Sequence, residues 1–236
     1  MTVWLRFEKQ KDGTVIQLRI QDLPPERIEE ATELMVKYFL RDEPVRRALE
    51  FLKNPEAIEE YRVYIDKILR SSHNVMCCLD NDDDHPVIMG ISIVNVASSA
   101  YWELTAGKGT PEAVKISNMY SDCIQACDVM KVFNLTSYYS DKSILVLPEY
   151  RGLGIAEKFL KVRRLMCAAH GLPLTAGWMT ASATQIAAKR DGWETIHEIP
   201  YDFFARKYNV TFENIPPTVK LMVGRPDPDN PAAIES

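Results

Sequence analysis

The feature that most constrains the fold is a buried strand that runs directly into a glycine-containing turn and then a helix. Ser143–Leu147 is an apolar run that suits a central strand covered on both faces. Pro148 has no N–H group, so strand pairing should stop there. A helix is predicted over Ile155–Ala169, and Gly171 should end it, because glycine accepts the left-handed conformation. The chain must therefore pack helices against a sheet.

The turn between this strand and this helix has the properties of an anion site. Gly152 and Gly154 allow a sharp turn and let the backbone approach a ligand without a Cβ in the way. The helix that follows directs its free N–H groups and the positive end of its dipole at the same point. This arrangement predicts a site for a phosphate group, in particular a pyrophosphate.

The type of pyrophosphate follows from what the turn contains. The dinucleotide fingerprint Gly-x-Gly-x-x-Gly fails because Glu157 occupies the third glycine position. The Gly-Lys-Ser/Thr of a Walker loop is absent from the turn. The pattern that is present is Arg-x-x-Gly-x-Ala, formed by Arg151, Gly154 and Ala156. A plain glycine-rich turn with no ligand stays open as the alternative.

The remaining elements predict an α/β (α+β) protein with a mixed sheet and helices on both faces. Period-two or apolar patterns predict further strands at Val15–Ile20, Asn74–Leu79, Val87–Val96, Leu174–Met179, Trp193–Ile199 and Lys220–Val223. Helical patterns are found at Pro25–Tyr38 (with Asp22 as its cap), at Pro55–Leu69, at Pro111–Val132 and in a short segment ending at Arg190. Residues 1–225 are interpreted as one domain and residues 226–236 as a flexible tail.

Charge and composition narrow the class of partner. The net charge is -5, so the basic face that a nucleic-acid partner needs is not expected. No apolar run approaches the roughly 20 residues of a membrane span, and the first residues resemble neither a secretory nor a transit peptide. Five cysteines without metal-ligand spacing predict neither a disulfide framework nor a zinc site. We expect a cytoplasmic protein, monomeric or weakly dimeric, without a membrane, nucleic-acid or metal partner.

Through these motifs, the chain resembles the GNAT superfamily of N-acetyltransferases from about residue 14 to residue 224. It is similar in particular to the insect arylalkylamine N-acetyltransferases. Three segments carry this resemblance: Tyr38–Pro44, Phe133–Leu135 and Tyr150–Ala156. The resemblance implies the GNAT fold, whose mostly antiparallel mixed sheet has about seven strands. It also implies acetyl-CoA as co-substrate, no metal, and a small-molecule amine as acceptor.

The same resemblance assigns roles to single residues. Glu43 would be the general base, and Thr180 and Thr184 would take the positions of two serines that precede the Gly192-Trp193 pair. Many superfamily members use a tyrosine as general acid where this chain has Ala188. Backbone N–H groups near Leu145 and Val146 would stabilise the negative charge that develops on the thioester carbonyl. The implied coenzyme-binding residues are Leu145, Val146, Arg151, Gly152, Leu153, Gly154, Ile155 and Ala156.

Each assignment has a structural alternative. Glu43 could be an exposed carboxylate at a helix end, and the threonines could belong to a capping box, Ser182–Gln185. Aromatic residues of the variable helices could line an arylamine pocket or pack in the core: Tyr38, Tyr61, Tyr64 and Tyr120. Cations on the helix after the turn could contact coenzyme phosphates or only solvent: Lys158, Lys161, Arg163 and Arg164.

The function predicted from these residues is transfer of the acetyl group of acetyl-CoA to the primary amine of a small arylalkylamine-like substrate. The amine would attack bound acetyl-CoA directly in a ternary complex. One alternative is a catalytically weak acyl-CoA-binding regulatory module, suggested by Ala188 and by threonines in place of serines. Another is an acetyltransferase for a polyamine or a protein lysine. The sequence leaves the amine, the acyl-chain length and the general acid open.

Overall fold

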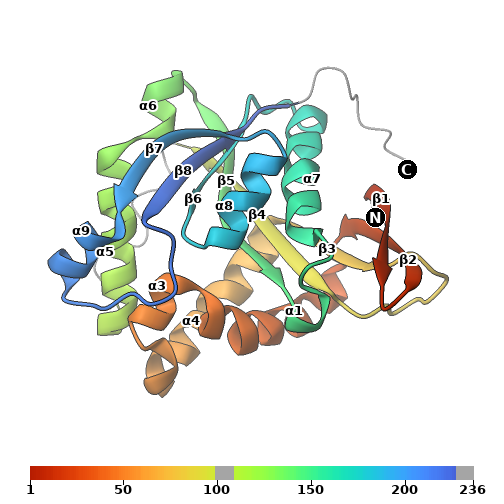
Figure 1. Cartoon of the computed structure of the whole chain (residues 1–236), viewed down its shortest axis with the longest axis horizontal. Helices are drawn as coiled ribbons and strands as arrows, with labels where there is room; N and C mark the ends of the chain where they lie inside the picture. The colour runs from red at the N-terminus through yellow and green to blue at the C-terminus, as the bar shows by residue number, and fades with distance from the viewer. Residues whose placement is uncertain (99–108, 227–236) are drawn as a thin grey trace.

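A computed structural model describes residues 1–98 and 109–226. Its centre is one eight-stranded sheet in the order β1-β2-β3-β4-β5-β6-β8-β7 (Figure 1). Neighbouring strands are antiparallel except β5 and β6, which are parallel. The strands are β1 Val3–Lys11, β2 Thr14–Asp22, β3 His73–Leu79, β4 Gly90–Ser98, β5 Ser137–Val146, β6 Thr175–Met179, β7 Glu194–Pro200 and β8 Thr218–Gly224.

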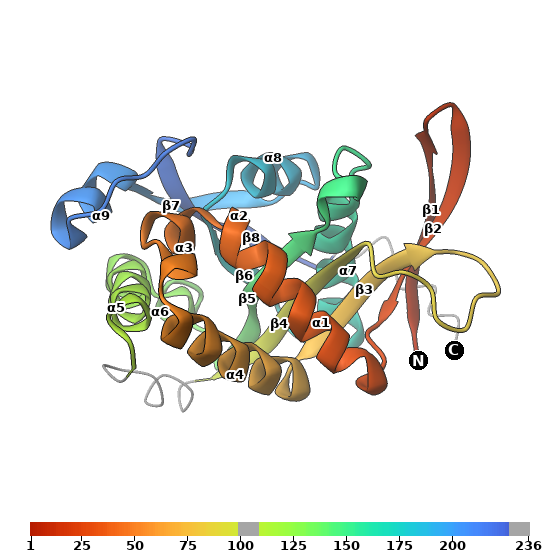
Figure 2. The same ribbon diagram turned by 90° about the horizontal axis from the view of Figure 1, so that it is seen from below.

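Helices cover both faces of this sheet. Figure 2 shows α1, α4 and α5 along one side, with α7 and α8 on the other. The α-helices are α1 Ile28–Leu34, α2 Leu40–Asp42, α3 Pro44–Ala48, α4 Pro55–Ser71, α5 Pro111–Ala126, α6 Val129–Phe133, α7 Ile155–Ala169, α8 Ser182–Arg190 and α9 Tyr201–Tyr208. Short 3-10 or π segments are η1 Pro25–Arg27, η2 Met35–Phe39, η3 Phe51–Lys53 and η5 Pro148–Tyr150. The predicted α/β architecture is confirmed, with one strand more than the seven expected.

Three helices on the first face begin with the same local chemistry. A polar residue accepts a backbone N–H bond, and proline follows it at the first helical position, where a missing N–H costs nothing. The pairs are Glu43 with Pro44, Asn54 with Pro55, and Thr110 with Pro111. These caps fix where α3, α4 and α5 begin, and thereby which side chains of each helix face the sheet.

Two local predictions were wrong. Asp22 does not cap the first helix. It ends β2 and accepts hydrogen bonds from the Thr2 amide at 2.8 Å and the Trp4 indole at 2.6 Å. The helix expected over 111–132 breaks after Ala126, because Asp128 caps a separate helix by accepting from the amides of Met130 and Lys131. The tail predicted for 226–236 lies outside the described residues from 227 onward.

The parallel pair β5–β6 is the part of the sheet that prepares a site. The two strands pair only at Tyr139↔Thr175 and Ser140↔Ala176. Farther along, β5 continues beside β4 as far as Val146, and β6 continues beside β8 as far as Met179. The strands therefore separate toward their carboxyl ends, and we refer to this opening as the strand split.

A buried arginine supports the start of the strand split. Lys142 is the extra residue of a β5 bulge, because Ile93 pairs with Ser143 whereas Val94 pairs with Asp141. Arg163 of α7, fully buried, donates to the Ser143 carbonyl at 2.9 Å and forms an ion pair with Asp141 at 2.7 Å. On the β6 side, a Cβ at Gly177 would lie 2.4 Å from that of Asp141, so glycine is needed there.

Candidate active site

The turn after β5 has the conformation that the sequence predicts. Gly152 and Gly154 have φ angles of +83° and +75°, which side-chain-bearing residues rarely adopt. The first helical hydrogen bond of α7 runs from the Lys158 amide to the Gly154 carbonyl. In the part of the chain that the structure describes, the amides of Gly152, Leu153 and Gly154 donate to no backbone carbonyl. The loop therefore presents unpaired N–H groups beside the amino-terminal end of a 15-residue helix.

Arg151 ties this loop to the segment that precedes Glu43. Its Nε donates to the Val146 carbonyl at 3.1 Å, and its terminal nitrogen forms an ion pair with Asp42. Hydrogen bonds from Arg41 and Arg151 lower the pKa of the Asp42 carboxyl. The anion loop and the Asp-Glu-Pro segment are therefore joined through one side chain, although 109 positions separate them along the chain.

Glu43 lies at the start of α3 and is 9% exposed. Its Oε2 accepts from the Arg46 amide at 2.8 Å and from the Arg46 guanidinium at 3.2 Å. Its Oε1 accepts from the Thr180 hydroxyl at 2.8 Å. The alternative of an exposed helix-end carboxylate is therefore wrong. The fold brings Glu43 and Thr180 together, a contact that was not predicted, and the catalytic role of each residue stays a prediction.

The two threonines differ in their surroundings. The Thr180 carbonyl accepts from the Tyr201 hydroxyl at 2.7 Å, which anchors the end of β6. Thr184 is half-buried in the first turn of α8, and the described residues give it no recorded contact with Glu43. The capping box is not formed, because the Gln185 side chain instead donates to the carbonyls of Met179 and Thr218. The role of Thr184 stays a prediction.

A cavity of about 380 Å³ opens from the strand split toward α4 and α5. We call it the acceptor cavity. Three of the four aromatic residues named from the sequence line it: Tyr61, Tyr64 and Tyr120. The fourth, Tyr38, lies elsewhere and packs beside Arg41 and Lys37. Other lining residues come from both sides of the split and from the facing helices: Arg46, Phe51, Glu60, Ile116, Ser140, Asp141, Lys142, Gly177 and Trp178.

Burial shifts the pKa of several groups around the site. It raises the pKa of the Tyr61 and Tyr201 phenols, so both stay neutral well above neutral pH. It lowers the pKa of the Lys142 ammonium, which Asp141 partly opposes. The cavity is therefore an aromatic enclosure with a few fixed charges, which suits a ligand that combines an apolar body with one reactive polar end.

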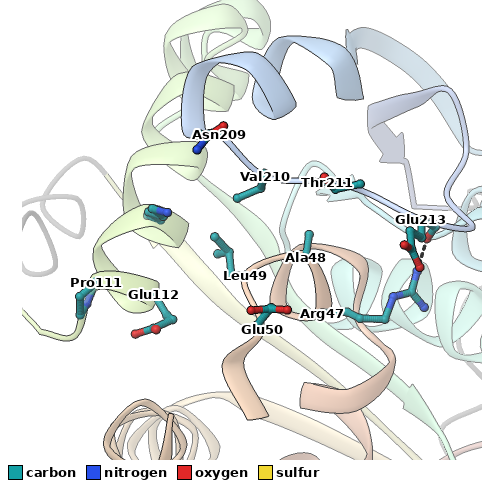
Figure 3. Close-up of a pocket in the computed structure, with 11 residues that line it drawn as sticks. Arg47, Ala48, Leu49, Glu50, Pro111, Glu112, Asn209, Val210, Thr211 and Glu213 are labelled. Atoms are coloured by element: carbon teal, nitrogen blue, oxygen red, sulfur yellow. Dashed lines mark hydrogen bonds between the residues drawn. The ribbon is translucent and has the colours of Figure 1, made fainter. Parts of the chain in front are cut away.

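A second cavity, of about 450 Å³, lies on another face of α5 (Figure 3). Three of its charged side chains already have protein partners. Arg47 donates to the Glu213 carbonyl, the dashed contact in Figure 3, and Glu112 accepts from Asn54 at 3.0 Å. Glu50 pairs with Lys53 at 2.6 Å. This groove is polar and lies at the opposite end of α3 from Glu43, so it is not the candidate active site.

The structure corrects the expectation for one of the α7 cations, Arg163. Its side chain is fully buried beneath the strand split, where it contacts Ser92, Asp141 and Ser143, so it does not face solvent. Arg164 donates to the carbonyls of Asp191 and Arg225. Lys158 lies 3.6 Å from Glu157 in the first turn. Ala188 is fully buried against Leu160 and Trp193, so the position of the family's tyrosine belongs to the core in this chain.

Sequence reasoning missed two residues that shape the site, Arg46 and Tyr201. The only signal for Arg46 was its place three residues after Glu43, where a helix beginning at Pro44 brings the two side chains together. Tyr201 had no signal, because its contact with Thr180 depends on how α9 packs. Across the described chain, no cluster of three or more His, Cys, Asp or Glu side chains is placed to hold a metal ion. All five cysteines are free thiols.

The split sheet, the glycine loop at the start of α7 and the helices on both faces define the fold of the GNAT acetyltransferases. The structure is similar to that of a yellow fever mosquito protein provisionally named arylalkylamine N-acetyltransferase 7, with a TM-score of 0.86 and 29% identity over 95% of each chain. Arylalkylamine N-acetyltransferase 2 from Aedes aegypti matches at a TM-score of 0.77 and 15% identity, over 89% of this chain and 99% of that one.

A third similar structure is the Drosophila melanogaster polyamine N-acetyltransferase, described as catalysing the formation of N-acetylagmatine. It matches at a TM-score of 0.68 and 14% identity, over 87% of this chain and 97% of that one. No model of a protein family and no curated protein sequence matches the chain. The resemblance inferred from the motifs is confirmed by the structural neighbours, which are insect arylalkylamine N-acetyltransferases and other GNAT proteins. Among the described residues, every helix is too short or too polar to cross a lipid bilayer.

Proposed function

We propose that this protein transfers the acetyl group of acetyl-CoA to the primary amine of a small arylalkylamine-like substrate. The observation that carries the proposal is the Glu43–Thr180 pair at the end of β6, which is joined to the aromatic acceptor cavity through Arg46, a residue that bonds Glu43 and lines that cavity. Structural neighbours named for arylalkylamines, agmatine and polyamines support amine acetylation as the reaction class. The cytoplasmic location and the oligomeric state stay predictions.

The residues of the loop and the split suit acetyl-CoA. The unpaired amides at 152–154 and the start of α7 would hold the diphosphate. The β5 edge that faces away from β4 has backbone groups not paired with β6 beyond Ser140, so the pantetheine arm could bond there. The amides around Leu145 and Val146 would stabilise the oxyanion. This account requires no metal.

The reaction needs a neutral amine, because an ammonium has no lone pair. Alkylamines have a reference pKa of about 10, so a base must take a proton near neutral pH. The nitrogen lone pair forms the C–N bond, the C–S bond breaks, and sulfur leaves as the coenzyme-A thiolate. We propose that the amine proton passes to the Thr180 oxygen while the Thr180 proton passes to Oε1 of Glu43. As the C–S bond breaks, water carries the second nitrogen proton to the thiolate, whose thiol has a reference pKa of about 8.5, so the products are the neutral amide, free coenzyme A and a protonated Glu43.

Thiol release from acetyl-CoA, measured with tryptamine, dopamine, octopamine and agmatine as acceptors, tests this function. We expect amine-dependent release that is fastest with an arylalkylamine. Glu43→Gln keeps the shape of the side chain but removes the base, and should lower kcat by about 10²-fold. Binding of acetyl-CoA without release for any amine would instead support a regulatory binding module. Undiminished turnover of Glu43→Gln across pH would remove Glu43 from the mechanism.

A further inference from the structure

Arg46 lies between the proposed base and the acceptor cavity. Its amide and its guanidinium both donate to Oε2 of Glu43, and Thr180 donates to the other carboxylate oxygen. Arg46 lines the acceptor cavity, whereas Glu43 is not among the described residues that line it. Arg46 therefore contacts both the acceptor cavity and the Glu43 carboxylate, and it bonds one of the two carboxylate oxygens.

Aromatic packing holds this guanidinium in place. Its central carbon lies 4.9 Å from the centre of the Phe39 ring and 5.0 Å from that of Tyr61. These two rings stack on each other with a centroid separation of 6.5 Å and an interplanar angle of 11°. The Arg46 side chain is only 11% exposed. A planar guanidinium stacked on rings has few alternative positions, so its bond to Glu43 has a defined direction.

The acids that line the acceptor cavity have partners other than Arg46. Asp128 accepts from the amides of Met130 and Lys131. Glu60 accepts from the amide and hydroxyl of Thr110 at 2.9 and 2.7 Å. Asp141 pairs with Arg163. Among the described residues, the carboxylate recorded as a partner of Arg46 is Glu43. The Arg46–Glu43 contact is therefore a specific pair, distinct from the other charged contacts of the cavity.

We infer that Arg46 is a positioning residue for acetyl transfer: by holding Oε2 of Glu43, it turns Oε1 toward Thr180 and the acceptor amine. The inference rests on the proposed function, in which Glu43 takes the proton. Because Arg46 acts through Glu43, its removal should harm the proton-transfer step and leave acetyl-CoA binding intact. A misplaced catalytic group commonly costs on the order of 10²-fold in rate.

A double-mutant cycle on kcat tests this inference. We expect Arg46→Gln to lower kcat by about 10- to 100-fold, with an unchanged Kd for acetyl-CoA. In the Glu43→Gln background the same change should lower kcat by less than about threefold, because residues that act as a unit are not additive. Arg46→Lys keeps the charge but not the stacked plane, and should recover part of the rate.

The neighbouring residue supplies a matched control. Arg47 lies on the same helix but bonds the Glu213 carbonyl in the other cavity, so Arg47→Gln should keep kcat within about twofold. Multiplicative losses in the double variant, or an equal loss in Arg47→Gln, would overturn the role of Arg46 and leave the proposed function standing. An inactive wild-type protein would overturn both. If Arg46→Gln does not fold, the kcat of Arg46→Lys, alone and with Glu43→Gln, decides by the same criterion.

Discussion

At the scale of single residues, Gly154 makes the clearest link between backbone conformation and ligand binding. A Cβ built there would lie 3.6 Å from the Lys9 side chain, which is ordinary contact, so steric crowding is not the constraint. The constraint is the φ of +75°, which costs a residue with a side chain about 1 kcal/mol or more. We expect Gly154→Ala to relax the loop and weaken acetyl-CoA binding by about 5- to 10-fold, measured by calorimetry.

Gly171 provides the control for that measurement. It has a similar φ of +65° and nothing within 4 Å of a built Cβ, but it follows the far end of α7. Gly171→Ala should therefore destabilise the fold comparably and leave acetyl-CoA affinity unchanged. Equal losses of affinity in the two variants would show that Gly154 matters through stability alone.

Single residues also show which parts of the site can be predicted from the sequence. The glycine loop was predictable, because its function depends on neighbours in the chain and on an adjoining helix. The roles of Glu43 and Thr180 came only from the family resemblance, and their contact was not predicted, since 137 positions separate them. The sequence does not predict which of Arg46 and Arg47 bonds Glu43. That choice depends on the exact helical turn that Pro44 begins and on the rings of Phe39 and Tyr61.

At the scale of elements, α7 supports the strand split through Arg163. This side chain donates to Ser92 at 2.9 Å and to the Ser143 carbonyl at 2.9 Å, in addition to its ion pair with Asp141. Removing one partner of a buried ion pair commonly destabilises by about 3–5 kcal/mol, because a charge is left uncompensated. We expect Arg163→Met to lower the free energy of unfolding by that amount in urea titrations. Adding Asp141→Asn should recover part of the loss.

If Arg163→Met lowered the free energy of unfolding by less than about 1 kcal/mol, this role would be contradicted, because a loss that small is typical of an exposed ion pair. The additional variant separates two causes. Recovery with Asp141→Asn identifies the uncompensated carboxylate as the source of the loss. No recovery would indicate that the hydrogen bonds to Ser92 and Ser143 matter more.

The elements themselves were largely predictable, and the errors have physical reasons. The central strand and α7 were found because apolar runs and helix signals agree there. The strand β1 was missed although Leu5 and Phe7 alternate with Arg6 and Glu8, a period-two signal that was present. Helix α9 was missed although Tyr201, Phe204 and Tyr208 repeat at helical spacing. The strand split was not visible in the sequence, because it depends on pairing between strands.

At the scale of the whole molecule, the site is assembled from four distant segments. Glu43 comes from the start of α3, Arg151 from the loop before α7, Thr180 from the end of β6 and Tyr201 from α9. The sheet order places β5 and β6 side by side and lets them diverge between the two helical layers. The site therefore exists only when the whole sheet is formed, and activity should be lost together with global unfolding.

The central claim is that the amides after β5 hold the diphosphate of acetyl-CoA. Hydrogen–deuterium exchange of the peptide covering 152–156 tests it directly, because amides without protein partners exchange quickly until a ligand bonds them. We predict slower exchange there with saturating acetyl-CoA, and no change with S-acetyl-N-acetylcysteamine, which carries the thioester but no diphosphate. Unchanged exchange at 152–156 with acetyl-CoA bound elsewhere on the protein would contradict the account.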